Sequence, residues 1–183
     1  PHPPVRLVIA YTPSNSLSSF QALIGPDAIY IPQVGADLGE RLISAAQWAR
    51  NQKYTKFLFV GSDSPTLPIQ YVELAFDLLE SRDVVIGPSV DGGYYLIGFS
   101  ARGAALAIPA LFEDITWSTD VVFQQTLERV QSVKARLGLL PPWYDVDTPS
   151  ELQLLRNHLL AMRLAGEKIP APQTEAELSK CAD

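Results

Sequence analysis

The sequence predicts a layered α/β domain with a mostly parallel central sheet, and three observations support this prediction. Short continuous apolar runs recur along the chain, as in strands that are buried on both faces. Segments with apolar residues at helical spacing stand between these runs. The alternation of the two kinds of segment is typical of a sheet that is covered by helices.

The predicted strands are the apolar runs themselves. They comprise residues 7–10, 57–60, 84–86, 94–99 and, as a short last strand, 137–140. Ligands of such sheets bind beyond the carboxyl ends of the strands. We therefore expect the chemistry in the segments that follow these runs.

The predicted helices each carry one apolar stripe, which core packing explains. They cover residues 38–49, 69–79, 123–130 and 152–162. Two of them have start signals. Asp37 is a candidate N-cap with Glu40 three residues on. Residues 148–151 combine an N-cap threonine, a proline at the first helical position and a capping box.

Length and composition favour a single globular domain. The chain has 183 residues, of which 47% are hydrophobic and 19% charged, so it can bury a substantial core. We expect a loose arm at residues 1–4, a domain over 5–165 and a peripheral tail over 166–183 with a short helix near 175–180. No apolar run approaches membrane-spanning length and the start has no signal-peptide core, so a cytoplasmic protein is expected.

The charge balance bears on the class of ligand. The formal net charge is -6 and the pI about 4.9, so the chain does not attract nucleic acid by its bulk field. If it binds a phosphorylated ligand, a divalent cation is the simplest way to offset the repulsion. The one cysteine, Cys181, can form neither an intrachain disulfide nor a cysteine-rich zinc site, which fits a reducing compartment.

The first candidate site is the segment Gly61-Ser62-Asp63-Ser64-Pro65, directly after the run 57–60. Asp63 leaves the carboxyl edge of the predicted sheet there. A carboxylate in this place can hold Mg²⁺ or Mn²⁺ against nucleotide phosphates. The alternative is that Asp63 caps the helix that begins near Pro68.

The second acidic segment is Tyr144-Asp145-Val146-Asp147. Its two carboxylates are two residues apart and point the same way in extended backbone. They are candidate metal ligands facing Asp63. The alternative is that they only complement the dipole of the helix that follows.

Two further segments are candidates for substrate contacts. The first segment begins with Asp91. Gly92 and Gly93 follow and let a ligand approach the backbone, and the ring of Tyr95 can line a cleft. The alternative is that this segment is a plain hairpin turn. In the second segment, Trp117 is a candidate platform on which a sugar stacks, and the alternative is a core residue. Ser118 is a candidate substrate contact, and the alternative is that Ser118 or Thr119 caps the helix that follows. No Ser/His/Asp set, Cys/His set or Walker phosphate loop is visible.

Taken together, these segments resemble the bacterial family known as radical-SAM/selenodomain-associated transferase 1. The resemblance spans about residues 5–160 and rests on seven motifs in order: Ala-Tyr-Thr-Pro at 10–13, Asp-Leu-Gly-Glu-Arg at 37–41, Gly-Ser-Asp-Ser-Pro-Thr-Leu at 61–67, Gly-Pro at 87–88, Asp-Gly-Gly-Tyr-Tyr-Leu-Ile-Gly at 91–98, Trp-Ser-Thr at 117–119 and Asp-Val-Asp-Thr-Pro at 145–149. Seven motifs in order are a specific signal for membership.

The resemblance implies a three-layer α/β/α nucleotide-diphospho-sugar transferase (GT-A-like) fold. Its relatives include molybdenum-cofactor and 2-phospholactate guanylyltransferases. In these relatives a carboxylate after a central strand and a late Asp or Asn hold the metal. By position Asp63 resembles the first, and Asp147 or Asp145 the second. Asp91 resembles a residue that binds substrate or base.

The sequence departs from this family at its start. Members begin with a strand and a basic loop that receives the nucleotide, whereas this sequence opens at what resembles the second strand, residues 5–10. The N-terminal strand and the nucleotide loop are thus absent from it. The resemblance implies that this strand is central, and its loss would leave unpaired backbone groups inside the sheet. Either this sequence lacks residues that the native protein has, or another segment or a partner fills the gap, or the chain is a degenerate, inactive member.

The leading interpretation is a metal-dependent transferase that acts on a nucleotide-activated donor, in particular a nucleotide sugar. Asp63 and Asp147 would hold the metal, and Asp91 and Tyr95 would shape the acceptor side. One alternative is a guanylyltransferase-like nucleotidyltransferase acting on a nucleoside triphosphate. The other is a catalytically inactive binding module that retains the scaffold. The sugar, the base, the acceptor and the oligomeric state, a homo-oligomer included, stay open.

Overall fold

The computed structural model describes residues 5–101 and 108–180. The predicted arm at 1–4 and Cys181 lie outside the described residues. The chain divides into two compact units, an N-terminal unit of residues 1–54 and a C-terminal unit of residues 55–183. This division differs from the predicted single domain over 5–165.

The N-terminal unit contains a two-stranded parallel sheet and two helices. Strands β1 (Val8–Tyr11) and β2 (Ile29–Pro32) pair in register from Val8 opposite Ile29 to Tyr11 opposite Pro32. Helix α1 (Leu17–Ile24) connects them, and α2 (Leu38–Asn51) follows β2. The predicted cap of α2 is confirmed, because the Asp37 side chain accepts from the amide of Glu40 at 2.8 Å. Neither β2 nor α1 was predicted.

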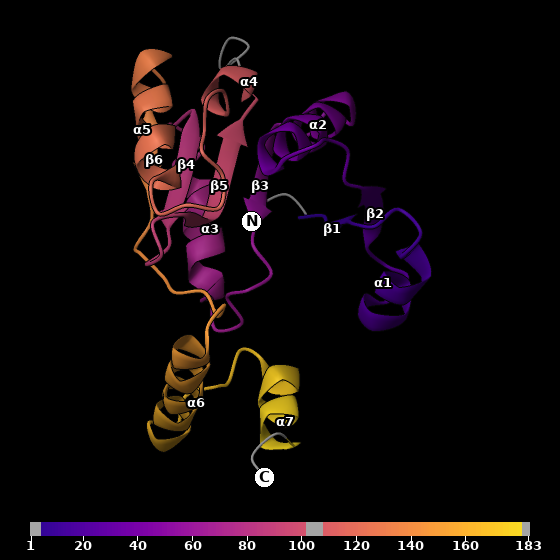
Figure 1. The fold of residues 1–183 in the computed structure, drawn as a ribbon, viewed down its shortest axis with the longest axis vertical. Helices are drawn as coiled ribbons and strands as arrows, with labels where there is room; N and C mark the ends of the chain where they lie inside the picture. The colour runs from indigo at the N-terminus through magenta and orange to yellow at the C-terminus, as the bar shows by residue number, and fades with distance from the viewer. Residues whose placement is uncertain (1–4, 102–107, 181–183) are drawn as a thin grey trace. The chain divides into compact units, whose positions relative to one another are not determined.

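The C-terminal unit is built on a four-stranded sheet in the order β3-β5-β4-β6, and Figure 1 labels its strands. Its strands are β3 (Lys56–Val60), β4 (Val84–Pro88), β5 (Tyr94–Ser100) and β6 (Leu137–Leu139). β5 pairs antiparallel with both β3 and β4, whereas β4 and β6 pair parallel. β3, β4 and β6 therefore run in one direction, and β5 runs against them.

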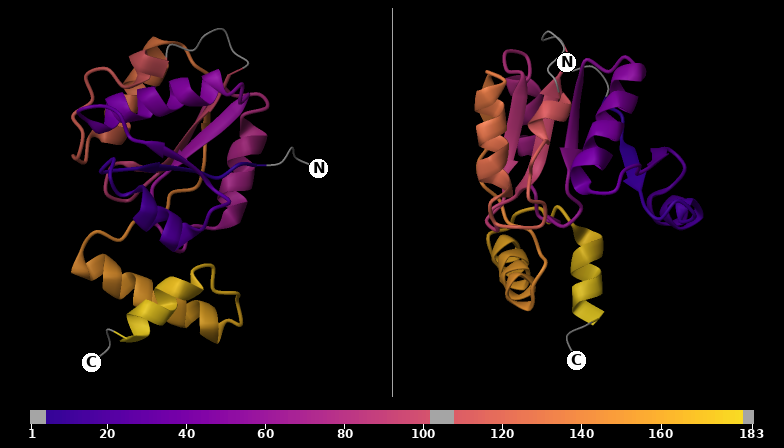
Figure 2. Two further views of the ribbon diagram at one scale, coloured as in Figure 1. Left: turned by 90° about the vertical axis from the view of Figure 1, so that its right-hand side faces the viewer. Right: turned by 45° about the horizontal axis from the view of Figure 1, so that its top comes forward.

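The helices of the C-terminal unit agree with the predicted stripes and add one short element. They are α3 (Ile69–Leu78), α4 (Ile108–Leu111), α5 (Val122–Ser132), α6 (Pro149–Leu164) and α7 (Pro172–Lys180). The capping box of α6 is confirmed. Figure 2 shows the same elements from two further sides. Within the described residues, no helix is both long and apolar enough to cross a membrane.

The core of this unit explains why the strand predictions succeed. β4 and β5 have a hydrogen-bonded neighbour on each side, and their side chains are covered on both faces. Val84, Val85 and Ile86 are 0% exposed. A strand with two covered faces needs no polar alternation, so it reads as a continuous apolar run.

The sheet corrects one part of the predicted fold class. β3, β4 and β6 run in one direction, but β5 is antiparallel to both of its neighbours, β3 and β4. The short turn that joins β4 to β5 accounts for the antiparallel pairing of these two strands. In the described part of the chain, β1 and β3 each have a strand neighbour on one side only. The backbone groups of their other edges therefore make no ladder with any described strand.

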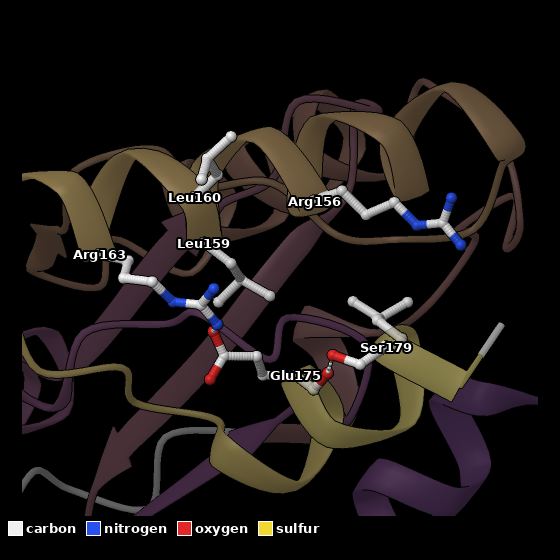
Figure 3. A pocket seen from close by; sticks show the side chains of 7 residues that line it. Arg156, Leu159, Leu160, Arg163, Glu175 and Ser179 are labelled. Carbon is white, nitrogen blue, oxygen red and sulfur yellow. Dashed lines mark hydrogen bonds and ion pairs between the residues drawn. The ribbon is translucent and has the colours of Figure 1, made fainter. Parts of the chain in front are cut away.

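Side chains of helices α6 and α7, both charged and apolar, line an open pocket of about 240 Å³. Figure 3 shows Arg163 of α6 paired with Glu175 of α7 across it. This ion pair attaches the predicted peripheral tail to α6. The pocket contains none of the predicted site residues.

Candidate functional site

Three loops follow the carboxyl ends of β3, β4 and β6 in the C-terminal unit. They carry Asp63, Asp91, and the pair Asp145 and Asp147. Because these three strands run in the same direction, their carboxyl ends meet at one edge of the sheet. The structure thus brings the predicted carboxylates to the edge where α/β sheets bind ligands.

The loop after β3 presents the carboxylate of Asp63 to solvent. A Cβ atom on Gly61 would lie 2.6 Å from Oδ1 of Asp63, so a larger residue at position 61 would turn this carboxylate away from its present place. Ser62 lies exposed in the same loop. The N-cap of α3 is Pro68, with no side-chain cap, so the structure does not support the alternative that Asp63 caps this helix.

The loop between β4 and β5 fixes the carboxylate of Asp91. Oδ1 of Asp91 accepts from the hydroxyl of Ser89 and, at 2.9 Å, from the amide of Gly93. Gly92 has φ +94°, and its carbonyl accepts from the amide of Phe123 at 2.9 Å. The hairpin interpretation is correct here, and the turn also holds an acidic side chain at the sheet edge.

The loop between β6 and α6 carries Asp145, which is half-buried, and Asp147, which is exposed. The amides of Asp147 and Thr148 both donate to Glu151 at 2.8 Å. These two bonds are the main reason why the pKa of Glu151 lies below its ordinary value. The capping box of α6 therefore fixes the backbone at Asp147.

The carboxylates of the three loops repel one another. Burial is the largest cause that raises the pKa of Asp145, and the like charges of Asp91, Asp147 and Asp63 raise it further. Each of the three is therefore close enough to Asp145 to act on its charge. Metal-free, the site is a concentration of negative charge that a cation would relieve.

Backbone hydrogen bonds join the third loop to the other two. The amide of Val146 donates to the carbonyl of Asp63 at 3.0 Å. The amide of Trp143 donates to Pro88 at 3.0 Å, and the amide of Val90 donates to Trp143 at 3.1 Å. Residues 143–146 thus hold the loops of Asp63 and Asp91 in register.

A set of three hydrogen-bonded side chains beside these loops was not predicted from the sequence. Thr66, which is 2% exposed, donates to the hydroxyl of Tyr144 at 2.7 Å, and this hydroxyl lies 2.8 Å from Nδ1 of His158. The sequence signal for Thr66 and Tyr144 is their place within the two acidic motifs. His158 has no comparable signal, because only the packing of α6 brings it to Tyr144.

Other predicted site residues lie in different surroundings. Tyr95 is 2% exposed, belongs to the core and donates to the carbonyl of Pro141 at 2.9 Å. The expectation that it shapes the acceptor side is corrected on this ground, because β5 is an internal strand. Trp117 is half-buried with its ring 6.0 Å from that of Phe112. Ser118 is exposed at φ +62°.

The capping alternative for Ser118 and Thr119 is also corrected. Helix α5 begins at Val122, and its N-cap, Val121, makes no side-chain cap. The hydroxyl of Thr119 instead donates to the carbonyl of Thr116 at 2.6 Å. A local turn that precedes the helix uses this hydroxyl.

The acidic loops fit a hard divalent cation by donor type. In the part of the chain that the structure describes, no group of three or more His, Cys, Asp and Glu side chains is placed to hold a metal ion. Mg²⁺ is commonly held by one or two carboxylates, with water and substrate phosphates as the other ligands. The carboxylate of Asp63, which has no partner among the described residues, suits such an incomplete site.

Comparison with solved structures relates this geometry to known proteins. The chain is similar to the "putative nucleotide-diphospho-sugar transferase" from Desulfovibrio desulfuricans G20, with a TM-score of 0.71 and 36% sequence identity. The match covers 78% of this chain but only 61% of that protein. The chain therefore spans about three fifths of the length of this relative, and the fold of the matched part is shared.

Comparison by sequence gives a family. No curated protein matches the chain. Residues 2–119 match the model of a bacterial family whose description is "Uncharacterized protein conserved in bacteria (DUF2064)". Since this match covers more than half of the sequence, the chain belongs to the DUF2064 family.

Proposed function

We propose that this chain is the metal-binding part of a transferase that acts on a nucleotide-activated donor, in particular a nucleotide sugar. One observation carries the proposal: Asp63, Asp91, Asp145 and Asp147 lie in the loops that follow β3, β4 and β6, whose carboxyl ends share one edge of the sheet. The similarity to a structure that is named for a nucleotide-diphospho-sugar transferase supports the choice of donor. We also propose the closer kinship with the radical-SAM/selenodomain-associated transferases.

The site residues have distinct roles in this proposal. Asp63 and Asp147, or Asp145 in place of Asp147, would hold Mg²⁺ or Mn²⁺, with water and substrate phosphates as the other ligands. The cation, when bound, neutralises the diphosphate and stabilises it as a leaving group. Asp91 would bind the acceptor or the base, because its hydrogen bonds to Ser89 and Gly93 fix its orientation.

The glycines of these two loops leave space for the donor beside the carboxylates of Asp63 and Asp91. Gly61 and Ser62 lie at the end of β3, next to Asp63. Gly93 offers a surface without a side chain beside Asp91. Both loops are exposed, so a diphosphate can reach them without rearrangement of the core. Trp117 and Ser118 are proposed to contact the sugar.

The released product tests this proposal. The protein is incubated with Mn²⁺, an acceptor library and either a nucleotide sugar or a nucleoside triphosphate. Release of nucleoside diphosphate from the sugar donor, abolished in Asp63→Asn, is the expected result. Release of pyrophosphate from GTP or CTP would instead identify a nucleotidyltransferase. If neither product forms and no nucleotide binds, the chain is a binding module and the proposal fails.

A further inference from the structure

A chain of three hydrogen-bonded side chains adjoins the acidic loops. Thr66 follows the Asp63 loop, Tyr144 immediately precedes Asp145, and His158 lies on α6. The hydroxyl of Tyr144 is in the middle, 2.7 Å from Oγ1 of Thr66 and 2.8 Å from Nδ1 of His158. One hydroxyl thus connects the loop after β3, the loop before α6 and α6 itself.

When all three side chains are uncharged, the hydrogen atoms of these two hydrogen bonds have one consistent arrangement. Because Thr66 donates to Tyr144, the single hydrogen of the tyrosine hydroxyl points to Nδ1 of His158. The imidazole then carries its own hydrogen on Nε2.

Aromatic packing holds the three groups in place. The ring of Trp143 stacks on Tyr144 at 5.6 Å and lies 5.9 Å from His158. Tyr71 meets Trp143 edge-on at 5.6 Å. Burying the hydroxyl of Tyr144 in this aromatic cluster costs free energy unless both of its hydrogen-bond partners are present. The two hydrogen bonds therefore favour one arrangement of the cluster.

We propose that Thr66, Tyr144 and His158 form a latch that positions Asp145 and Asp147 against Asp63. They are positioning residues, and none of them touches substrate. The inference rests on the proposed function, because the spacing of these carboxylates matters only if they share a cation. Without the latch, the backbone bonds at Trp143 and Val146 and the capping box still tie the segment to its neighbours, but the Tyr144 side chain no longer links it to Thr66 and to α6.

The test compares Tyr144→Phe with Tyr71→Phe. Both changes remove one hydroxyl and keep the ring, but only Tyr144 links two partners; the hydroxyl of Tyr71 has none among the described residues. Two readouts are taken: amide hydrogen exchange of residues 143–148, and the affinity for Mn²⁺ alone by electron paramagnetic resonance. We expect Tyr144→Phe to exchange about 5- to 30-fold faster and to bind Mn²⁺ about tenfold more weakly. Tyr71→Phe should match the wild type within about twofold.

Variants of the outer partners sharpen the test. His158→Leu removes the acceptor, whereas His158→Asn places an amide atom near the position of Nδ1. We expect the leucine variant to behave like Tyr144→Phe and the asparagine variant to recover most of the Mn²⁺ affinity. Thr66→Val combined with Tyr144→Phe should cost no more than Tyr144→Phe alone, because the two residues share one bond.

The outcomes separate this inference from the proposed function. If Tyr144→Phe equals the wild type in exchange, or exchanges faster with unchanged Mn²⁺ affinity, the positioning role is overturned. Faster exchange throughout residues 55–180 would also overturn it, since the effect would be global. If the wild type binds no Mn²⁺, the proposed metal site fails, and local exchange at 143–148 alone decides whether the latch exists.

Discussion

The backbone amide of Val146 donates to the backbone carbonyl of Asp63 at 3.0 Å. These residues are far apart in the sequence, yet this bond joins the two acidic motifs directly. Its consequence is that Asp63 and the flanking residues Asp145 and Asp147 belong to one site. Burial is the main cause that raises the pKa of Asp145, and the like charges of Asp147 and Asp63 raise it further, which agrees with this.

Asp145→Asn should raise thermal stability without metal and weaken metal binding. The change removes one charge from a crowded acidic cluster, so the metal-free protein gains stability at pH 7. We expect a rise of about 2–4 °C in EDTA, the size of a contribution near 1 kcal/mol in a chain of this length. Asp27→Asn, in an exposed loop of the N-terminal unit, is the control. Equal melting temperatures of Asp145→Asn and wild type in EDTA would contradict the repulsion.

Gly92→Ala should destabilise the protein more than Gly166→Ala. Both glycines have positive φ, +94° and +73°, so both substitutions strain the backbone. Only at Gly92 would the new Cβ collide, 2.1 Å from the carbonyl oxygen of Asp120. We expect Gly92→Ala to cost about 2 kcal/mol or more and Gly166→Ala about 1 kcal/mol, measured by urea unfolding. Equal costs would show that the turn does not pack on residue 120.

Asp83→Asn should lower stability in a pH-dependent way. The side chain of Arg136 donates to both oxygens of Asp83, at 2.8 and 3.0 Å, and holds the pKa of this carboxyl below its ordinary value of 3.8. The folded state therefore favours the charged form. The resulting stability is complete above pH 3.8 and is lost as the pH falls through the lower folded pKa.

We expect Asp83→Asn to melt about 2–4 °C below the wild type at pH 7, with the difference shrinking toward zero below pH 3.8. Thermal melts across this pH range measure it. Glu177→Gln is the control, because Glu177 and Lys180 are 70% and 69% exposed and their pair should contribute little. A difference that does not change with pH would contradict the role of the Asp83 charge.

The elements of the core could be predicted because their sequence patterns are strong. β4 and β5 are covered on both faces and therefore form continuous apolar runs. β2 was missed because Ile29–Pro32 is a short strand at the edge of its sheet and ends in proline. The antiparallel placement of β5 follows from tertiary pairing, which the local pattern of residues 94–99 does not contain.

The candidate site could be predicted in part for a related reason. Asp63, Asp145 and Asp147 follow strands, so their place at the sheet edge can be inferred from the sequence. Tyr95 was assigned wrongly, although the continuous apolar run 94–99 already indicates a strand that is covered on both faces; the contact of its hydroxyl with Pro141 depends on tertiary packing. His158 could not be found either, since its contact with Tyr144 depends on how α6 packs.

The most direct test of the central claim is a thermal-shift measurement with a panel of nucleotides and nucleotide sugars, with and without Mn²⁺, on wild type and Asp63→Asn. The account predicts that one nucleotide raises the melting temperature of the wild type only when Mn²⁺ is present, and that Asp63→Asn loses this shift while melting normally without ligand. A Mn²⁺-dependent shift of the same size in Asp63→Asn would contradict the assignment of the metal to Asp63.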